Sequence, residues 1–555
     1  MKLNRRRLFI ALLLCISSLF AQTQQERSSS HPLSAAEASE LKTYIHSAWQ
    51  TLTRTQTDCR SLSDPKLTTK PVLYVPADLQ LPPAVQQIET KCAVKIAKLP
   101  RPIHQMGDVK ASEVQPGLLY LPNPYVVPGG RFNEMYGWDS YFIIRGLVRD
   151  GELDMARNMI ENFFFEIEHY GAVLNANRTY YFTRSQPPFL TSMIMSYYDA
   201  RKRAGSPDRE WLMRAYDFAQ RDYQLWMRDP KLAGNTGLSR YFDLGDGPVP
   251  EMGDDPTYYS DVTSNLLAMR ESPAADYLAA DDARDSAQVG PQFQLQVCAV
   301  QETNGGAGHC SESRHVSLSQ EFYKGDRAMR ESGFDPSFRF GPYDGSTHHY
   351  APVCLNSLLY KAEQDLAQMA DALGRASDAS KWKQLAEQRK AAINKYFWNQ
   401  QAGMFFDYDF LHGRQSDYYY ASAFYPLWAG LATPEQALAV ERNLGFFEHA
   451  GGIAMSNRAT GMQWDLPFGW APLQLLPIEG LRRYGFDADA DRVSQEFVSE
   501  VYDNFKRDQT IREKYNVVTR STQAAVSAGY KTNVVGFGWT NGVTLVLMDA
   551  KDVVK

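Results

Sequence analysis

Five segments of the chain combine aromatic rings with charged or amide side chains over short distances. They are PGGRFNEMYGWDSYF (128–142), LNANRTYYFTRSQPPF (174–189), RESGFDPSFRFG (330–341), GMQWDLPFGWAP (461–472), and REKYNVV with GFGWTNGV (512–518 and 536–543). A core strand or an amphipathic helix would separate apolar from polar residues by its period, and these segments do not. Flat rings beside hydrogen-bonding groups suit a flat, hydroxyl-rich ligand, so the segments predict a carbohydrate site.

The segments lie between stretches with helical periodicity. In 355–373 the apolar residues recur at steps of three and four, as Leu355, Leu358, Leu359, Ala362, Leu366, Met369, Ala370 and Leu373. This spacing places them on one helix face. Similar patterns cover 150–170, 190–204, 210–228, 377–397, 433–443, 472–484 and 490–506. Paired helices of this kind predict an all-α toroid of helical hairpins, with the five segments as loops at one end.

Two regions depart from this pattern. Residues 65–130 are rich in proline, and we expect an arm that wraps the toroid. Residues 260–330 have a weaker helical signal and accumulate small and polar residues, so we expect an insertion or an extended loop there.

The composition excludes several classes of protein. With 44% hydrophobic residues among 555, the chain has ample material for a packed core and is not globally disordered. Its 58 Lys and Arg against 64 Asp and Glu give a net charge of −6 without long charge runs. Proteins that bind nucleic acids usually carry a basic patch, and this mildly acidic chain shows none in its sequence, so we expect no nucleic-acid partner.

The N-terminus has the pattern of an export signal. Three arginines precede a short apolar run, and small residues lead to Ala21, so residues 1–21 are predicted to be a signal peptide. The run is too short for a membrane span, and we expect no stable membrane insertion. Because Arg6-Arg7 also resembles a twin-arginine signal, export by the twin-arginine pathway and export by the general secretory pathway both remain open. We expect a periplasmic or secreted protein, with a flexible and then helical segment over 22–64.

Export would leave five cysteines able to oxidise. Cys59–Cys92 and Cys298–Cys310 are plausible disulfides, and Cys354 lies in an apolar helical pattern as a buried thiol. No cysteine spacing matches a metal site. His348-His349 lacks partner ligands in the sequence, so we expect no metal.

The five segments, with LPNPYVVPGGRF (121–132), resemble the signature segments of the α,α-trehalase family of glycoside hydrolases in the same order, over residues 65–550. The resemblance implies an (α/α)6 toroid, with a short N-terminal arm and an inserted loop region of about 260–330, as a single catalytic domain over 65–550. It also implies inverting hydrolysis of trehalose to two glucose molecules. Neither a metal nor an organic cofactor is required, because two carboxyl groups suffice.

By resemblance, Asp335 is the general acid and Glu513 the general base. An inverting site needs one protonated carboxyl for the leaving oxygen and one ionised carboxyl for the attacking water, about 6.5–9.5 Å apart. Asp335 should therefore have a raised pKa. The positions implied to bind substrate are Arg131, Trp138, Asp139, Asn175, Arg184, Ser185, Gln186, Glu251, Gly333, Gln463, Trp464, Asp465, Trp470, Phe537 and Trp539. Arg131, Arg184 and Glu251 can equally form a structural ion-pair network.

Two departures from the family bear on the substrate. Val249 stands where the family has an arginine, and we expect Arg240 or Arg339 to replace it if a donor is needed there. The segment before GFGWTNGV has Gly529-Tyr530 in place of a Glu-Tyr pair, which leaves lid mobility open. The leading interpretation is a trehalase that needs no cofactor and acts as a monomer on a disaccharide. The alternatives are an inverting α-glucosidase for another α-glucoside, such as kojibiose or glucosylglycerol, and a non-catalytic sugar-binding protein.

Overall fold

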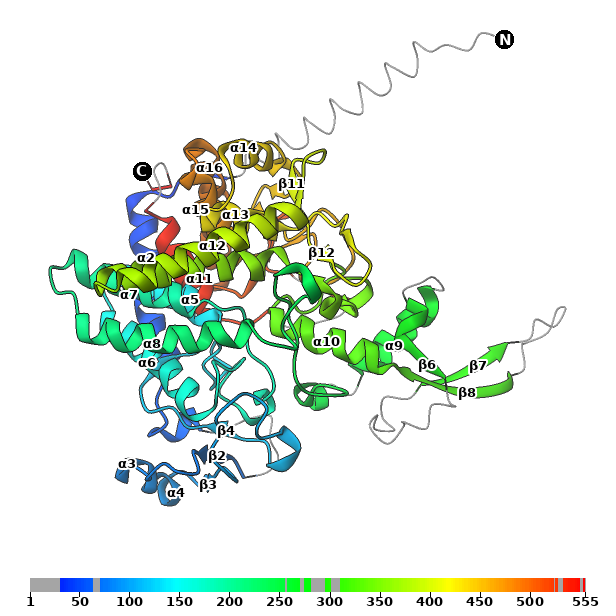
Figure 1. Cartoon of the computed structure of the whole chain (residues 1–555), viewed down its shortest axis with the longest axis horizontal. Helices are drawn as coiled ribbons and strands as arrows, with labels where there is room; N and C mark the ends of the chain where they lie inside the picture. The colour runs from blue at the N-terminus through cyan, green and yellow to red at the C-terminus, as the bar shows by residue number, and fades with distance from the viewer. Residues whose placement is uncertain are drawn as a thin grey trace, which may run out of the picture.

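The computed structural model describes residues 30–62, 70–254, 257–269, 274–280, 295–300, 310–523, 525–527, 533–549 and 553–554 (Figure 1). The predicted signal peptide lies outside these residues, as does Gly529-Tyr530. Among the described residues, no helix is both long enough and apolar enough to cross a membrane.

Six helices of the described chain form a closed inner ring. Each one contacts the next along the chain, and the last contacts the first. In ring order they are α5 (Asp139–Asp150), α7 (Leu190–Arg203), α11 (Val353–Ala372), α13 (Tyr425–Ala429), α15 (Pro472–Arg483) and α17 (Gly538–Leu547). The closure of this ring confirms the predicted all-α toroid.

A second set of helices surrounds the ring. They are α2 (Ala35–Leu52), α6 (Leu153–His169), α8 (Arg209–Trp226), α12 (Ala376–Tyr396), α14 (Pro434–Arg442) and α16 (Asp487–Asp508). Five of them follow an inner helix directly and return along its outside, whereas α2 comes from the N-terminal end of the chain and covers α17. Because each hairpin returns in this way, the inner helices all begin at the same end of the toroid.

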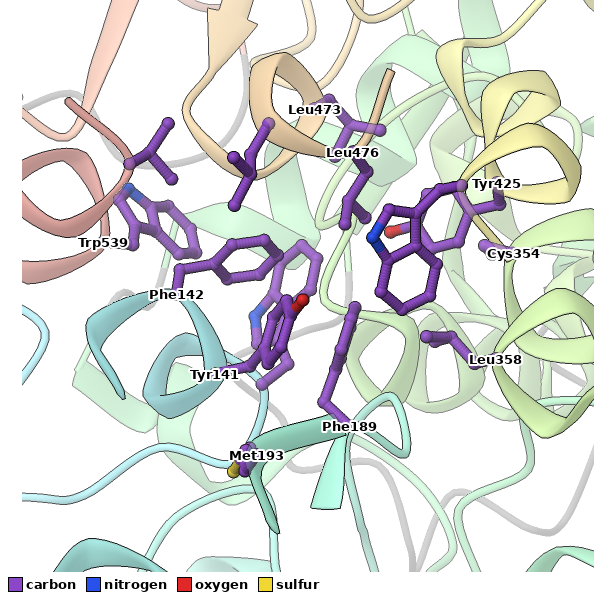
Figure 2. Packing of buried hydrophobic residues seen from close by; sticks show 14 of the residues in the cluster. Tyr141, Phe142, Phe189, Met193, Cys354, Leu358, Tyr425, Leu473, Leu476 and Trp539 are labelled. Carbon is purple, nitrogen blue, oxygen red and sulfur yellow. The ribbon is translucent and has the colours of Figure 1, made fainter. Parts of the chain in front are cut away.

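The middle of the ring is filled by side chains. Figure 2 shows residues from all six inner helices meeting there, with Phe189 just before α7; they are Tyr141, Phe142, Met193, Cys354, Leu358, Tyr425, Leu473, Leu476 and Trp539. Tyr141 stacks on Phe189 with ring centroids 4.6 Å apart. The middle of the toroid is therefore a packed core and not a channel.

The proline-rich region contains a small parallel sheet, which the sequence analysis did not predict. Its strands are β2 (Val72–Val75), β3 (Lys95–Lys98) and β4 (Leu118–Leu119) in the order β3-β2-β4, with short helices α3 (Pro83–Gln86) and α4 (Ile88–Lys91). The predicted disulfide Cys59–Cys92 is present and ties the segment after α2 to this sheet region. Cys354 is buried and free, as predicted, whereas the side chains of Cys298 and Cys310 lie outside the described set.

The region expected as an inserted loop also carries regular elements. They are α9 (Tyr258–Met269), the antiparallel strands β6 (Leu278–Ala280), β7 (Leu295–Val300) and β8 (Cys310–Leu318), and α10 (Gln320–Ser332). In Figure 1, α9 and the strands extend away from the toroid, and α10 leads back to it. The buried residues of α10 include Asp326, Arg327, Arg330 and Glu331. A search for periodic apolar residues therefore could not reveal this helix.

The remaining strands of the described chain have two or three residues each and form four pairs and one three-stranded sheet in the loops. They are β1 (Thr53–Arg54) with β5 (Tyr125–Val126), β9 (Tyr350–Ala351) with β12 (Tyr408–Asp409) and β13 (Arg414–Gln415), β10 (Trp398–Asn399) with β11 (Met404–Phe405), β14 (Glu448–His449) with β15 (Gly452–Ile453), and β16 (Phe468–Trp470) with β17 (Lys514–Asn516). The last pair joins two of the five mixed segments, with Trp470 opposite Lys514.

Candidate active site

An open cavity, with about 650 Å³ of empty space when its solvent-filled mouth is included, lies among the five mixed segments. Four of these segments run directly into the first residues of α5, α7, α15 and α17, and the fifth lies between α10 and α11. Because the inner helices begin at one end of the toroid, segments far apart in the sequence converge there.

Asp335 lines the cavity just after α10. Gly333 follows the end of this helix with a φ of 77°, and a Cβ at this glycine would lie 2.8 Å from the Trp138 ring. Arg330 Nη1 lies 3.8 Å from Asp335 Oδ2. Burial raises the pKa of Asp335 to about 7, against the opposing effect of Arg330 and Arg184. The carboxyl group can therefore hold a proton near neutral pH, as a general acid must.

Glu513 reaches the cavity from the segment before β17. Its main-chain N–H donates to the Val534 carbonyl at 3.0 Å, and its own carbonyl accepts from Trp539 Nε1 at 3.2 Å. The side chain is buried, and Oε2 has no hydrogen-bond partner among the described residues. Burial raises the pKa of Glu513, while Lys514 and then Arg131 lower it. A carboxylate in the cavity wall that has an oxygen without a protein partner can accept a proton from a bound water.

Asp139 is a third carboxyl group at the cavity, in the first turn of α5. Its pKa is raised well above the ordinary value, mainly by burial and further by the negative charges of Glu513 and Asp335. Asp139 therefore lies close enough to both carboxyls to respond to their charge. In its protonated form it can donate a hydrogen bond to a sugar hydroxyl.

A side-chain bridge connects the segments that carry Asp335 and Glu513. Gln463 Nε2 donates to the main-chain carbonyl of Asp335, and Gln463 Oε1 accepts from Lys514 Nζ at 2.7 Å. Lys514 is fully buried, and its ammonium lies 4.9 Å from the centroid of the Trp470 ring. One amide and one ammonium group thus hold the two loops in a fixed relation.

Arginine and carboxylate side chains form a second polar wall. Arg184 pairs with Glu251, lies 3.8 Å from Asp243, and packs its guanidinium 4.9 Å from the Tyr181 centroid. Arg184 Nε and Glu251 Oε2 are buried without a hydrogen-bond partner among the described residues. The ion-pair network expected as an alternative thus exists for these two residues, and both still face the cavity.

Tryptophans form the apolar wall. Trp464 and Trp470 stack with centroids 4.0 Å apart and an interplanar angle of 2°. Trp539 packs edge-on against both, whereas Trp138 is tilted by 40° against Trp464. The four rings are almost fully buried, so only small parts of their surfaces are available to a ligand. Rings locked in this way give a rigid wall for a sugar.

Most of the residues expected from the sequence lie together at this cavity. They are Trp138, Asp139, Asn175, Arg184, Gln186, Glu251, Gly333, Asp335, Gln463, Trp464, Trp470, Glu513, Phe537 and Trp539. The lining also includes Pro128, Phe132, Tyr136, Tyr181 and Arg330, which sequence reasoning did not assign to the site although each lies in or directly beside a quoted segment.

Three expected residues do not line the cavity. Arg131 is exposed, and its guanidinium lies 4.7 Å from the Phe132 centroid. The Ser185 hydroxyl donates to the Val173 carbonyl at 2.6 Å. Asp465 accepts hydrogen bonds from Tyr418, Ser456, Thr460 and the main chain of Phe338. Ser185 and Asp465 therefore hold the loops, and Arg131 influences the site through its charge near Glu513.

The position of the absent arginine is apolar and buried. Val249 packs with Tyr258, Tyr259 and Val262, and its N–H donates to the Tyr259 hydroxyl at 3.1 Å. The expected replacements lie elsewhere. Arg240 donates to the His348 carbonyl at 2.8 Å, and Arg339 pairs with Asp407 at 2.6 Å. Arg330 is the additional guanidinium at the cavity.

Comparison with known proteins gives one family. The family model described as Trehalase matches residues 13–282 and 297–551. A probable trehalase from Eremothecium gossypii is 37% identical over 75% of this chain and 56% of its own length. A cytosolic neutral trehalase from Saccharomyces cerevisiae is 34% identical over 89% of this chain and 69% of its own length. The solved structure of a neutral trehalase from Saccharomyces cerevisiae has a TM-score of 0.73 at 32% identity, covering 92% of this chain and 94% of that one.

The chain spans about half the length of the first curated relatives that it matches, at 56% and 53%. The comparisons also contradict the expected periplasmic or secreted location. The relatives from Saccharomyces cerevisiae, Kluyveromyces lactis, Neurospora crassa and Emericella nidulans are cytosolic neutral trehalases. A periplasmic trehalase from Xanthomonas oryzae pv. oryzae matches at 36% identity. The family match begins at residue 13, inside the segment that was expected to be a signal peptide. The comparisons give no support for a signal peptide.

Proposed function

We propose that this chain, which belongs to the trehalase family, hydrolyses α,α-trehalose to two glucose molecules with inversion at one anomeric carbon. The observation that carries the proposal is the pair of buried carboxyl groups at one cavity, Asp335 with a pKa of about 7 and Glu513 beside a buried lysine. Their different surroundings support different protonation states, which an acid and a base require.

In the proposed reaction, Asp335 gives its proton to the glycosidic oxygen as the bond from that oxygen to the anomeric carbon breaks. Glu513 takes a proton from a water molecule whose oxygen forms the new bond to the same carbon from the opposite face. One glucose leaves with its configuration retained, and the other carries the inverted hydroxyl. A later exchange of protons with solvent returns both carboxyl groups to their starting states.

The electrostatics of the site support these roles. Burial keeps the Asp335 proton in place, whereas Lys514 and Arg131 favour the ionised form of Glu513. We propose that Arg184, Glu251 and Arg330 bind the sugar hydroxyls and that the tryptophan wall receives the ring faces. The reaction as proposed uses no metal or cofactor, and the protein acts as a monomer, which size-exclusion chromatography tests.

The proposal is tested by glucose release from trehalose, beside maltose, kojibiose and glucosylglycerol. We expect release from trehalose and a loss of about 100- to 10,000-fold in kcat for Asp335→Asn and for Glu513→Gln. Two buried carboxyls outside the cavity give matched controls: Asp222→Asn in α8, whose pKa burial also raises to about 7, and Glu500→Gln in α16. We expect both controls to retain activity.

Other outcomes point to other functions. Preferential turnover of another glucoside, lost in the same two variants, would keep the chemistry and replace the substrate. Binding of trehalose in calorimetry without any turnover would leave a sugar-binding protein. Equal activity of Asp335→Asn and the unaltered chain would refute the assigned roles.

A further inference from the structure

A cluster of two histidines and a glutamate lies outside the cavity. Glu321 is in the first turn of α10, and His348 and His349 end the short helix η9 (Thr347–His349). His348 Nε2 lies 2.9 Å and His349 Nε2 lies 2.6 Å from the same oxygen, Glu321 Oε1. The ligand atoms of the three residues all lie within 4.8 Å of one another.

The convergence of two neighbouring histidines on one oxygen is specific to the local backbone. In an extended chain, consecutive side chains point to opposite sides. Here the tight turn of η9 brings both rings to the same side, with centroids 4.1 Å apart. Two imidazole nitrogens and one carboxylate oxygen form a donor set suited to zinc and similar divalent transition ions.

We propose that Glu321, His348 and His349 bind one divalent transition-metal ion of the zinc type. Four ligands at about 2.0–2.1 Å from a tetrahedral zinc lie about 3.3 Å from each other. The present 2.6 and 2.9 Å separations must therefore widen by about 0.7 and 0.4 Å. The Glu321 side chain, which is 47% exposed, has the freedom to move and leaves a path for the ion. A water molecule would occupy the fourth coordination position of the ion.

The surroundings limit the expected affinity. His348 Nδ1 is buried without a hydrogen-bond partner among the described residues. Zinc-binding histidines usually donate this second N–H, and loss of such a partner typically weakens binding by 10- to 100-fold. We therefore expect a dissociation constant in the micromolar range.

The location of the cluster indicates a structural role. Glu321 precedes the end of α10 by eleven residues, about 16 Å along the helix, so the ion is remote from Asp335. It would join the start of α10 to η9 and thereby close the segment that carries Arg330 and Asp335. The helix and this segment already approach closely, since a Cβ at Gly325 would lie 1.8 Å from the Gly345 carbonyl oxygen. The ion should therefore raise thermal stability and leave the chemistry unchanged.

The test is titration of the full, tag-free chain with ZnCl2 by calorimetry after removal of metal with EDTA. We expect one ion per chain and a rise in Tm that grows with zinc concentration. Glu321→Gln and His349→Asn should each abolish saturable binding and the rise in Tm. His412→Asn is the matched control, because His412 pairs with Asp409 at 2.7 Å and no third metal ligand among the described residues joins them. This variant should bind zinc as the unaltered chain does.

Two results would overturn the proposal. One is the absence of saturable binding up to 100-fold above the micromolar range. The other is binding of equal strength in Glu321→Gln and His349→Asn, which would assign it to adventitious sites. Circular dichroism checks that each variant is folded, and because the two substitutions affect different elements, either folded variant decides the question. Trehalose hydrolysis is not a readout, so the outcome is independent of the proposed function.

Discussion

Replacing Lys514 with methionine should impair the site in two separable ways. The Lys514 ammonium is fully buried and donates to Gln463 Oε1 at 2.7 Å, and Gln463 in turn holds the Asp335 carbonyl. Methionine has a similar length but neither the charge nor the donor. The substitution therefore removes the hydrogen bond from the ammonium to the Gln463 amide oxygen, and it removes the cation that most lowers the pKa of Glu513.

The expected sizes follow from these two losses. A hydrogen bond to a charged group contributes about 1.5–3 kcal/mol, and if this energy positions Asp335, its loss lowers kcat by about 10- to 100-fold. An opposite charge within a few ångströms lowers a carboxyl pKa by about 1–3 units. Without it, Glu513 takes up its proton at higher pH, and the acidic limb of the rate profile should move upward by about one pH unit.

The assay is kcat and KM for trehalose from pH 4 to 9, for Lys514→Met and Lys514→Gln. Glutamine can still donate to Gln463 but lacks the charge, so we expect it to move the acidic limb while recovering part of kcat. Lys231→Met is the control, because Lys231 is also buried and pairs with Glu331 at 2.6 Å instead. An acidic limb that stays in place in both Lys514 variants would refute the electrostatic argument.

Three other predictions concern the acid loop. The pH profile of kcat/KM should be bell-shaped. It should fall above about pH 7, where Asp335 loses its proton, and it should fall on the acid side where Glu513 takes up a proton, at a pH above the ordinary pKa of a glutamate. A plateau extending to pH 9 would contradict this prediction. Because the folded-state pKa of Asp335 is raised, its contribution to stability is present at low pH and is lost as pH rises through about 7. Urea unfolding should therefore show Asp335→Asn gaining on the unaltered chain by up to about 1.4 kcal/mol per pH unit between about pH 4, the ordinary pKa of an aspartate, and pH 7, with no further gain above pH 7. Parallel curves between pH 4 and 7 would refute the raised pKa. Gly333→Ala should lower kcat at least about tenfold, because its Cβ meets Trp138 at 2.8 Å, whereas Gly237→Ala, with a similar φ of 75° but open space, should lose only stability.

The sequence predicted most of the toroid because its helices have apolar faces. The pattern at 355–373 corresponds to α11 (Val353–Ala372), and those at 472–484 and 490–506 correspond to α15 and α16. The helix α10 was missed because its buried face carries Asp326, Arg327 and Arg330, which a hydrophobic period cannot detect. The sheet of β2, β3 and β4 was missed because its strands have two to four residues.

The candidate site divides in the same way. Residues within the mixed segments could be gathered from the sequence, since each segment leads into or lies before an inner helix. The contact of Gln463 with Lys514 could not, because it depends on the pairing of β16 with β17, and these strands lie more than forty positions apart. The use of Arg330 as the cavity arginine likewise depends on where α10 ends relative to the toroid.

Val249 illustrates how the structure changes the meaning of a substitution. From the sequence, a valine in place of an arginine reads as a missing sugar ligand. In the fold, its side chain belongs to a buried apolar cluster with Tyr258 and Tyr259, and Tyr258 packs 5.2 Å from the Arg330 guanidinium. An arginine at position 249 alone would bury a second positive charge near Asp326, which already pairs with Arg330 and accepts from Tyr259, at a cost of several kcal/mol. The valine and the placement of Arg330 are therefore parts of one arrangement, in which a different helix supplies the positive charge at the cavity.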